Sequence, residues 1–453
     1  MRASPHRACV LAALVAGCAV FAVALALILG GARHERSEFD QNKFHARVIG
    51  RFAQQMPRLD FRDYESATSP GYHVVLAAAR RSGLESPTGL RVVGSLFSVG
   101  LMATLAGWLA ARVGAAAALA LALPMGASLY VLFPAVWLLP DNAGWWPLAA
   151  LLATLLPGAR HEALRPASFV LAGSLLVLLI AARQVHAWAG LPMLVAAWLA
   201  WPASRTDSVS CSVVPPVGEA RPAIARTAVM ALAGLPAALL LALLVRTWGG
   251  LVPPAFQAAG SPLTTPDATR VSGISPATPG FVLALLGLFG SFFLPVVWPR
   301  RATGWFPLTA GFAAGAMVLA ALPRTNWELM SRISGLWNLV RVLPCPGDRS
   351  LLIIGLAGLG GAWIGLWAGA LAPRPRWVLG VSLVGFTLSQ TAGALTWQRY
   401  LEPMVLLLLV LGSGCLLESA SPADRRRAVV GPVALGLVQA ALTAWTLSGR
   451  SAA

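Results

Sequence analysis

Long apolar runs separated by short polar turns dominate this chain. A helix needs about 20 apolar residues to cross the hydrocarbon core of a bilayer. Thirteen runs reach or approach that length. We therefore predict an all-α polytopic membrane protein with about 13 transmembrane helices, at 9–30, 92–111, 114–134, 145–157, 168–182, 187–201, 227–246, 280–298, 304–323, 351–371, 377–393, 401–417 and 429–447.

The composition agrees with that pattern. Of 453 residues, 57% are hydrophobic and 11% are charged, whereas an average soluble protein has about 25% charged residues. A water-soluble globular protein is therefore excluded. The run at 9–30 is longer than the core of a cleaved signal peptide, about 7–15 residues, so we expect a retained anchor. The five cysteines show no paired spacing, so neither a disulfide framework nor a zinc site is expected.

The arginines predict the orientation, because basic residues concentrate in short cytoplasmic loops. With a cytoplasmic amino terminus, the short outside turns carry only Arg183 and Arg399. The net charge of +17 then reflects loop topology, and no nucleic-acid partner is expected. The short inside turns carry Arg112, Arg160, Arg165, Arg300, Arg301, Arg374, Arg376 and Arg425–Arg427.

Hydrophilic stretches interrupt a chain that we otherwise expect to be one membrane domain over 1–453. Residues 204–226 are rich in Pro and Ser and predict a cytoplasmic linker, and 247–279 predict an outside loop. The outside segment 324–350 predicts an interfacial helix, because apolar residues recur there at helical spacing beside Trp327 and Trp337. The recurring residues are Leu329, Ile333, Leu336 and Val340.

The first outside loop, 31–91, concentrates the titratable groups. It holds seven of the 17 acids and three of the six histidines. Such a concentration in one loop of a membrane protein favours chemistry or recognition there over a merely solvated loop. The groups are Glu35, Glu38, Asp40, Asp60, Asp63, Glu65, Glu85, His34, His45 and His73.

Two helices are expected in this loop. A four-residue repeat of apolar residues predicts a helix that lies in the membrane interface with its apolar side in lipid. A second short helix is expected to begin at Pro70-Gly71 and to run toward Arg80 and Arg81. The repeat consists of Phe44, Val48, Phe52 and Met56.

The loop resembles a known enzyme family. Residues 39–45 (FDQNKFH) and 64–73 (YESATSPGYH) are similar to the Asp-Glu-x-Phe-His and Thr-x-Pro-Gly-x-Tyr pattern of GT-C glycosyltransferases, especially the dolichyl-phosphate-glucose alpha-1,2-glucosyltransferases. Residues 183–188 (RQVHAW) resemble the family's Arg-Gln-Thr-Asn-x-x-Trp segment, and 399–403 (RYLEP) its late Arg-Tyr element. Here Asp40 precedes His45 by five residues instead of four, Gln41 replaces the second acid, and Tyr72 comes one place early.

The resemblance implies a GT-C fold and transfer of a sugar, a hexose by this likeness, from a polyprenyl phosphate to an acceptor hydroxyl. Such a reaction needs a carboxylate to accept the hydroxyl proton and cations to stabilise the leaving phosphate. Asp40 matches the family's first-loop acid and is our candidate base, with a helix N-cap as its alternative role. Asp60, Asp63 and Glu65 are its rivals.

Other candidates lie at the outside ends of the predicted spans. Arg183 suits a phosphate because its guanidinium is a planar fork, although an interface anchor is the alternative. Asp141 either binds an acceptor or caps a helix, and Arg399 either pairs with Glu402 or contacts the donor. The resemblance adds Gln184, His186 and Tyr400 as donor contacts, and His45, Tyr64, Glu65, Thr68, Tyr72 and Glu402 as acceptor or loop residues.

These expectations describe an inverting, polyprenyl-phosphate-dependent hexosyltransferase of a bacterial inner membrane, with its site on the extracytoplasmic side. The acceptor is a glycan, a lipid or a protein. No resident cofactor and no metal are implied, and no nucleotide-binding motif is present. The alternatives are a flippase for a lipid-linked saccharide, which would carry paired broken helices or inverted repeats, and an O-antigen-ligase-like transferase.

Overall fold

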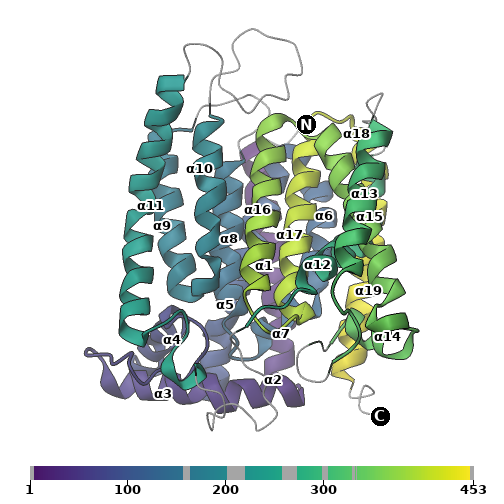
Figure 1. Cartoon of the computed structure of the whole chain (residues 1–453). Coiled ribbons are helices and arrows are strands. Elements are labelled where there is room, and N and C mark those ends of the chain that lie inside the picture. Colours follow the sequence, from purple (N-terminus) through teal and green to yellow (C-terminus); the bar gives the residue numbers. More distant parts are fainter. Residues whose placement is uncertain are drawn as a thin grey trace.

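The computed structural model describes residues 5–156, 164–200, 220–257, 273–297, 305–328, 332 and 334–448. Every regular element in these ranges is a helix (Figure 1). Seven described helices are long and apolar enough to cross a membrane, so the chain is a multi-pass α-helical membrane protein. They are α1 (Pro5–Leu29), α5 (Pro87–Val113), α11 (Ala220–Trp248), α12 (Thr278–Val297), α15 (Leu351–Ala370), α17 (Gln398–Leu417) and α19 (Val430–Leu447).

The other predicted spans coincide with shorter or bent helices. Helices α6 (Ala115–Ala127) and α7 (Leu129–Val136) form one candidate span with a 71° bend. A total of thirteen spans and a GT-C fold stay predictions. The remaining helices at predicted spans are α8 (Asp141–Leu155), α9 (Pro166–Ala182), α10 (Gly190–Trp198, after the 3-10 turn Gln184–Ala189), α13 (Trp305–Ala321) and α16 (Pro373–Thr391).

Local sequence signals set the helix boundaries. Ser86 caps α5 by accepting a hydrogen bond from the backbone N–H of Gly89, and Pro87 occupies the first helical position, where its missing N–H costs nothing. Helix α5 ends at Gly114, whose φ of +86° suits glycine. Ser350 caps α15 in the same way through the N–H of Ile353.

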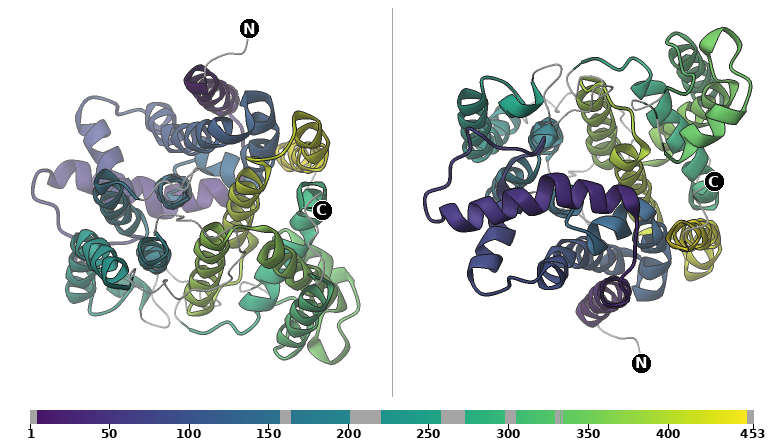
Figure 2. Two further views of the ribbon diagram at one scale, coloured as in Figure 1. Left: turned by 90° about the horizontal axis from the view of Figure 1, so that it is seen from above. Right: turned by 90° about the horizontal axis from the view of Figure 1, so that it is seen from below.

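Helix α17 is the central helix of the bundle. Each residue from 401 to 411 is buried, and Figures 1 and 2 show α17 enclosed by other helices. A helix that is apolar on all sides is expected in such a place. Arg399 and Glu402 lie within its first five residues, so the start of α17 places one partly buried and one buried charged side chain among the surrounding helices.

A helical run lies across one end of the bundle, nearly perpendicular to the other helices (Figures 1 and 2). It consists of α2 (Glu35–Asp40), a π-helix (Gln41–His45) and α3 (Ala46–Gln55), and α4 (Gly71–Arg81) packs beside it. The start of α1 and α18 (Pro422–Ala428) lie at the opposite end (Figure 1). The start of α4 at Gly71 confirms the second predicted loop helix.

The apolar side of this run faces protein, so the prediction that it faces lipid was wrong. Val48, Ile49 and Phe52 are buried in a cluster with Tyr64 and Trp248, among others. The sequence pattern did not distinguish these cases, because an amphipathic stripe packs equally well on protein or on lipid.

Two further boundaries differ from the predictions. Helix α11 begins at Ala220, so residues 220–226 of the predicted linker are helical, and 201–219 lie outside the described residues. In 324–350 the described helices are α14 (Leu336–Val342) and a short 3-10 turn (Pro346–Asp348), while Leu329 and Ile333 lie outside the described residues. Trp337 is fully buried and stacks on Phe281 at 4.3 Å between ring centroids, so it is not an interface anchor.

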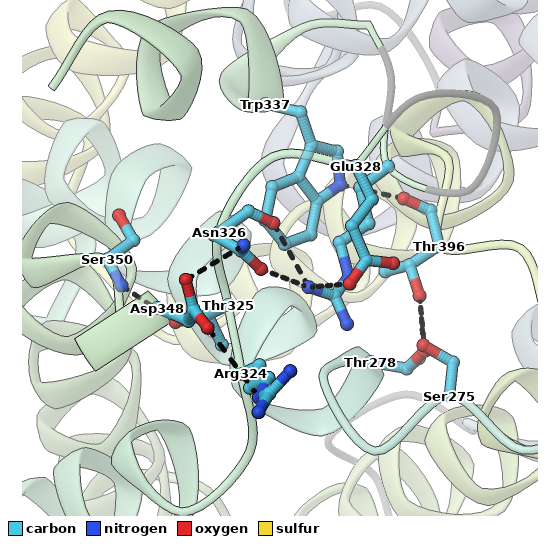
Figure 3. Close-up of polar contacts among 11 residues, drawn as sticks. Ser275, Thr278, Arg324, Thr325, Asn326, Glu328, Trp337, Asp348, Ser350 and Thr396 are labelled. Atoms are coloured by element: carbon cyan, nitrogen blue, oxygen red, sulfur yellow. Dashed lines mark hydrogen bonds and ion pairs between the residues drawn. The ribbon is translucent and has the colours of Figure 1, made fainter. Parts of the chain in front are cut away.

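Polar contacts fasten the segment 324–350 beside the start of α17 (Figure 3). The indole N–H of Trp337 donates to the carbonyl of Thr396 at 2.7 Å. The Thr396 hydroxyl lies 2.6 Å from that of Ser275 and 2.8 Å from that of Thr278. These bonds hold residue 396 from two sides, immediately before the residues that form the candidate site.

Candidate functional site

An ion pair joins the first loop to α17. Arg399 Nη1 donates to Asp40 Oδ2 at 2.6 Å, although the two residues are 359 positions apart in the chain. Their side chains are 20% and 17% exposed, which protects the pair from solvent screening. Asp40 has helical backbone angles inside a continuous helical run and makes no capping hydrogen bond. The N-cap alternative is therefore wrong, and His34 caps this run instead.

A second ion pair lies on the neighbouring helices. Arg183 Nη1 donates to Asp141 Oδ1 at 2.5 Å, and both side chains are mostly buried. Arg183 directly follows α9, and Asp141 is the first residue of α8 but makes no capping hydrogen bond. Arg183 is therefore not a solvent-facing anchor and Asp141 does not cap α8, whereas a role of Asp141 in acceptor binding stays a prediction.

Two aromatic rings connect the pairs. The guanidinium carbons of Arg183 and Arg399 lie 5.1 and 4.9 Å from the centre of the Tyr400 ring. Tyr400 stacks on Trp397 at 5.5 Å, and Arg36 lies 4.5 Å from the centre of the Trp397 ring. Cation–π contacts of this kind stabilise arginines without neutralising them.

The cluster keeps an excess of positive charge. Three arginines (Arg36, Arg183 and Arg399) face two aspartates (Asp40 and Asp141) in the contacts above. Burial and the charge of Arg399 lower the pKa of Arg36, as expected where two cations are close. Nε of Arg399 is buried without a hydrogen-bond partner among the described residues. The site is therefore prepared for an anion.

A cavity of about 600 Å³ ends at this cluster. Arg36, Asp141, Trp397 and Arg399 line its polar end. Most of the remaining wall is apolar and comes from α7, α12, α14 and α19. Leu339 on α14 and Leu442 on α19 line it and are 54% and 59% exposed, so the cavity reaches the outer surface of the helix bundle. Its apolar lining includes Leu129, Phe133, Phe289, Leu336, Leu339 and Leu442.

Glu402 lies on another wall of the same cavity and is 4% exposed. Its carboxylate accepts hydrogen bonds from Ser128 at 2.6 Å, Gln398 at 2.6 Å and Gln439 at 3.0 Å. Arg399 thus pairs with Asp40, and the proposed Arg399–Glu402 ion pair is not formed. Ser128 is the residue at the bend between α6 and α7, so Glu402 fastens that bend to α17 and α19.

Gln184 and His186 occupy supporting positions. Gln184 Nε2 donates to the carbonyl of Ala67 at 2.9 Å, and its Oε1 accepts a hydrogen bond from Ser69 at 3.0 Å. It therefore holds the first loop to the end of α9. His186 is 1% exposed, and both its ring nitrogens are buried without a partner among the described residues. Burial, with the charge of Arg183, lowers its pKa to about 3, so the ring is neutral at physiological pH.

The remaining loop candidates separate into two groups. His45 and Tyr64 are buried and hydrogen-bonded to His73, whereas the hydroxyl of Tyr72 is buried without a partner in the described part of the chain. Thr68 contacts Ser66 through its hydroxyl at 3.1 Å.

The rival acids lie elsewhere in the loop. Asp60 forms an ion pair with Arg62 at 3.0 Å, and Glu65 approaches Arg47 at 3.9 Å. Asp63 accepts a hydrogen bond from Arg51 through its backbone carbonyl. Their described contacts do not include the arginines of the cluster, whereas Asp40 is joined to the cluster through Arg399, which lines the cavity.

Sequence reasoning missed several residues of this region. Arg36 and Trp397 line the cavity, and Gln41 anchors the helical run by accepting hydrogen bonds from Arg91 Nε at 3.0 Å and the N–H of Leu138 at 3.1 Å. Trp397 lies two residues before the candidate Arg399-Tyr400 pair, so its position in the sequence could have pointed to it. No sequence signal distinguished Arg36, because it is one of nine arginines in the loop.

No model of a known protein family matches the chain, and no curated protein matches it either. Among the described residues, no group of three or more histidine, cysteine or acidic side chains is arranged to hold a metal ion.

Proposed function

We propose that this protein is a membrane glycosyltransferase that moves a sugar, a hexose by the family likeness, from a polyprenyl phosphate to an acceptor hydroxyl. One observation carries the proposal: an apolar cavity that reaches the outside of the helix bundle ends at two arginines, an aspartate and a tryptophan. These lining residues contact the rest of the ion-pair cluster, namely Asp40, Arg183 and Tyr400. A polyprenyl-phosphate sugar matches this cavity, because it has an apolar chain, an anionic phosphate and a polar sugar ring in that order.

The cavity lining suggests how the donor would bind. The isoprenoid chain would lie along the leucine and phenylalanine wall, because burying apolar surface contributes about 25 cal/mol per Å². The phosphate would lie at Arg36 and Arg399, where the guanidinium fork can make two parallel hydrogen bonds to phosphate oxygens. The sugar would then lie beside Trp397, which lines the same end of the cavity.

The reaction would be a single displacement. The acceptor oxygen forms a bond to the anomeric carbon as the bond from that carbon to the phosphate oxygen breaks. The electron pair leaves with the phosphate, the hydroxyl proton moves to Asp40, and the configuration at the anomeric carbon inverts. A general base contributes roughly 10²–10⁴-fold in rate. The arginines would stabilise the negative charge that develops on the phosphate.

The Asp40–Arg399 contact would make activation of the base depend on prior binding of the donor. A phosphate at Arg399 would share the guanidinium with Asp40 and weaken the ion pair, which releases the carboxylate to accept a proton. Asp40 would thus become an effective base when the donor is bound. By the family resemblance, we place this end of the bundle on the extracytoplasmic side of a bacterial inner membrane.

The test is transfer by the purified full-length protein in phospholipid vesicles that contain polyprenyl-phosphate glucose and extracted envelope glycans and lipids. We expect labelled product with the wild type and a loss of at least about 10²-fold with Asp40→Asn. Asp60→Asn is the matched control, because Asp60 is an exposed acid of the same loop, and it should transfer normally. Full activity of Asp40→Asn would remove the base from this scheme.

Mass spectrometry of envelope lipids from cells that lack the protein separates a transferase from a flippase. A missing hexose with accumulated polyprenyl-phosphate sugar supports a transferase, whereas lipid-linked saccharide trapped on the cytoplasmic face contradicts it. The helices favour the transferase, because transporters use paired broken helices and the described helices include a single bent pair, α6 and α7.

A further inference from the structure

One histidine at the polar end of the cavity takes no part in the scheme above. His34 lines the cavity together with Arg36 and Ser37 and directly precedes α2. Its Nδ1 accepts a hydrogen bond from the backbone N–H of Ser37 at 3.2 Å and lies 2.9 Å from the Ser37 hydroxyl. The inner nitrogen of the ring is thus occupied in capping the helical run.

The capping bond determines which ring nitrogen of His34 carries the proton. A backbone N–H only donates, so Nδ1 must present a lone pair. Burial and the charge of Arg36 lower the pKa of His34, so the ring is neutral at physiological pH. A neutral imidazole with a bare Nδ1 carries its one proton on Nε2. The outer nitrogen of His34 is therefore an N–H donor.

Aromatic packing holds this N–H in place and leaves it accessible. The centre of the His34 ring lies 4.4 Å from that of Phe133 and 5.9 Å from that of Trp137. Nε2 of His34 makes no described hydrogen bond, yet it is not among the buried, unpartnered atoms, in contrast to Nε1 of Trp137. Because His34 lines the cavity, its N–H is available to a ligand there.

The neighbouring groups indicate which kind of ligand atom this N–H meets. Arg36 and Arg399 line the same end of the cavity and only donate hydrogen bonds, while Asp141 is paired with Arg183. A group that binds both arginines and His34 must offer several acceptor atoms, as a phosphate does. Burial and the charge of Arg399 already lower the pKa of Arg36, and a neutral N–H adds a hydrogen bond without increasing this repulsion.

We propose that Nε2–H of His34 donates a hydrogen bond to a non-bridging phosphate oxygen of the prenyl phosphate at Arg36 and Arg399. This rests on the proposed function. The bond involves no proton transfer, because the ring stays neutral while Nδ1 accepts from Ser37. One imidazole then joins the phosphate to the start of the helical run that carries Asp40, so binding of the sugar donor and the position of the base are connected.

Two substitutions separate the capping role of His34 from the binding role. The amide of asparagine reaches about as far as Nδ1, so His34→Asn keeps a capping acceptor and removes the outer N–H. The amide of glutamine reaches about as far as Nε2, so His34→Gln keeps an N–H toward the phosphate and weakens the cap. Each variant is thus the matched control of the other.

The measured quantities are the KM for polyprenyl-phosphate glucose and the thermal midpoint of the full-length protein in vesicles. We expect His34→Asn to raise the KM about tenfold, the scale of one hydrogen bond to a charged group, at a nearly normal midpoint. We expect His34→Gln to lower the midpoint and to keep a KM close to that of the wild type. A residue that only caps the helix gives an unchanged KM in His34→Asn, and that result overturns the proposal.

Nitrogen-15 NMR of histidine-labelled full-length protein in nanodiscs tests the bond without any activity. The chain has six histidines, and the signals of His34 are those missing from His34→Asn or His34→Gln. We expect an unprotonated Nδ1 and a protonated Nε2, and farnesyl phosphate should move the Nε2–H proton downfield. Farnesol lacks the phosphate and should leave this signal in place. A protonated Nδ1, or equal shifts with both probes, overturns the proposal.

The outcomes distinguish the role of His34 from the transferase itself. Sugar transfer with an unchanged KM in His34→Asn overturns the role of His34 and leaves the transferase standing. A shift at His34 with farnesyl phosphate alone, without sugar transfer to any acceptor, supports the prenyl-phosphate contact and overturns the transferase. If neither variant inserts into membranes, the response of the wild-type histidine signals to the two probes decides.

Discussion

Carboxylates lie in opposite settings at the two walls of the cavity: Asp141 lines one wall, where Arg399 also pairs with Asp40, and Glu402 lines the other. Asp40 and Asp141 each face an arginine, whereas the described hydrogen bonds to Glu402 all come from neutral donors. An ion pair can exchange partners when a phosphate arrives. A carboxylate held by three fixed donors, at the α6–α7 bend and on α17 and α19, cannot leave without breaking those hydrogen bonds. The comparison assigns chemistry to the first wall and the joining of helices to the second.

The largest expected effect is at Asp40. Asp40→Asn keeps the size of the side chain but removes its basicity, so the transfer rate should fall by roughly 10²–10⁴-fold while membrane insertion stays normal. Initial rates at saturating donor measure this. A loss equally large in Asp60→Asn would show that the loop, and not this acid, is sensitive to substitution.

The next effect is at the partner of Asp40. Arg399→Lys retains the charge but loses the planar fork that grips a phosphate. We expect an increase of about 10- to 100-fold in the KM for polyprenyl-phosphate glucose, which corresponds to one or two charge-assisted hydrogen bonds. Arg62→Lys, at an exposed ion pair, is the control. An unchanged KM would mean that the donor phosphate binds elsewhere.

Substitution of Glu402 should lower stability and leave sugar transfer nearly unchanged, the opposite of the effect expected at Asp40. Glu402→Ala leaves Ser128, Gln398 and Gln439 without their acceptor, and each buried polar group that loses its partner costs about 1–3 kcal/mol. We expect a lower thermal midpoint and nearly normal turnover per folded molecule. A folded Glu402→Ala protein that does not transfer sugar would abolish the contrast between the two walls.

The smallest effect concerns the pH dependence of stability. Burial and the charges of Arg399 and Arg183 lower the pKa of His45 to about 3, below the value of about 6.5 in an unfolded chain. Below pH 6.5 the unfolded state therefore binds more protons than the folded state. The free energy of unfolding decreases as the pH is lowered, by roughly 1 kcal/mol at pH 6 for this group. His45→Gln should reduce this slope in thermal unfolding between pH 7.5 and 6, while a slope equal to wild type would contradict the assignment.

The sequence predicted the helical membrane architecture because long apolar runs leave few alternatives in a bilayer. It also marked the residues that meet at the site, since Asp40, Asp141, Arg183 and Arg399 were all candidates before their contacts were known. The pairing itself was not predictable, because it joins positions 359 apart. Spacing suggested Arg399 with Glu402, three residues on, but packing around α17 directs the two side chains to different partners.

Local context explains the other misses. The apolar stripe of α3 was predicted to face lipid, yet Trp248 of α11 and Tyr64 cover it, and periodicity carries no information on which partner will cover a helix. Trp337 was predicted as a membrane anchor, but its N–H found the Thr396 carbonyl instead. In both cases a distant segment supplied the deciding contact.

The π-helix has a consequence for insertions and deletions. A π-turn is an ordinary helix that has absorbed one additional residue, so loss of Asn42 would restore a regular ladder with His45 four places after Asp40, the spacing of the family that this loop resembles. Helix α3 contains no additional residue at Ala53. Loss of Ala53 would therefore rotate the residues that follow it by about 100° about the helix axis. A scan of single deletions across 41–55, measured by transfer rate, should therefore show tolerance only within the π-helix at 41–45.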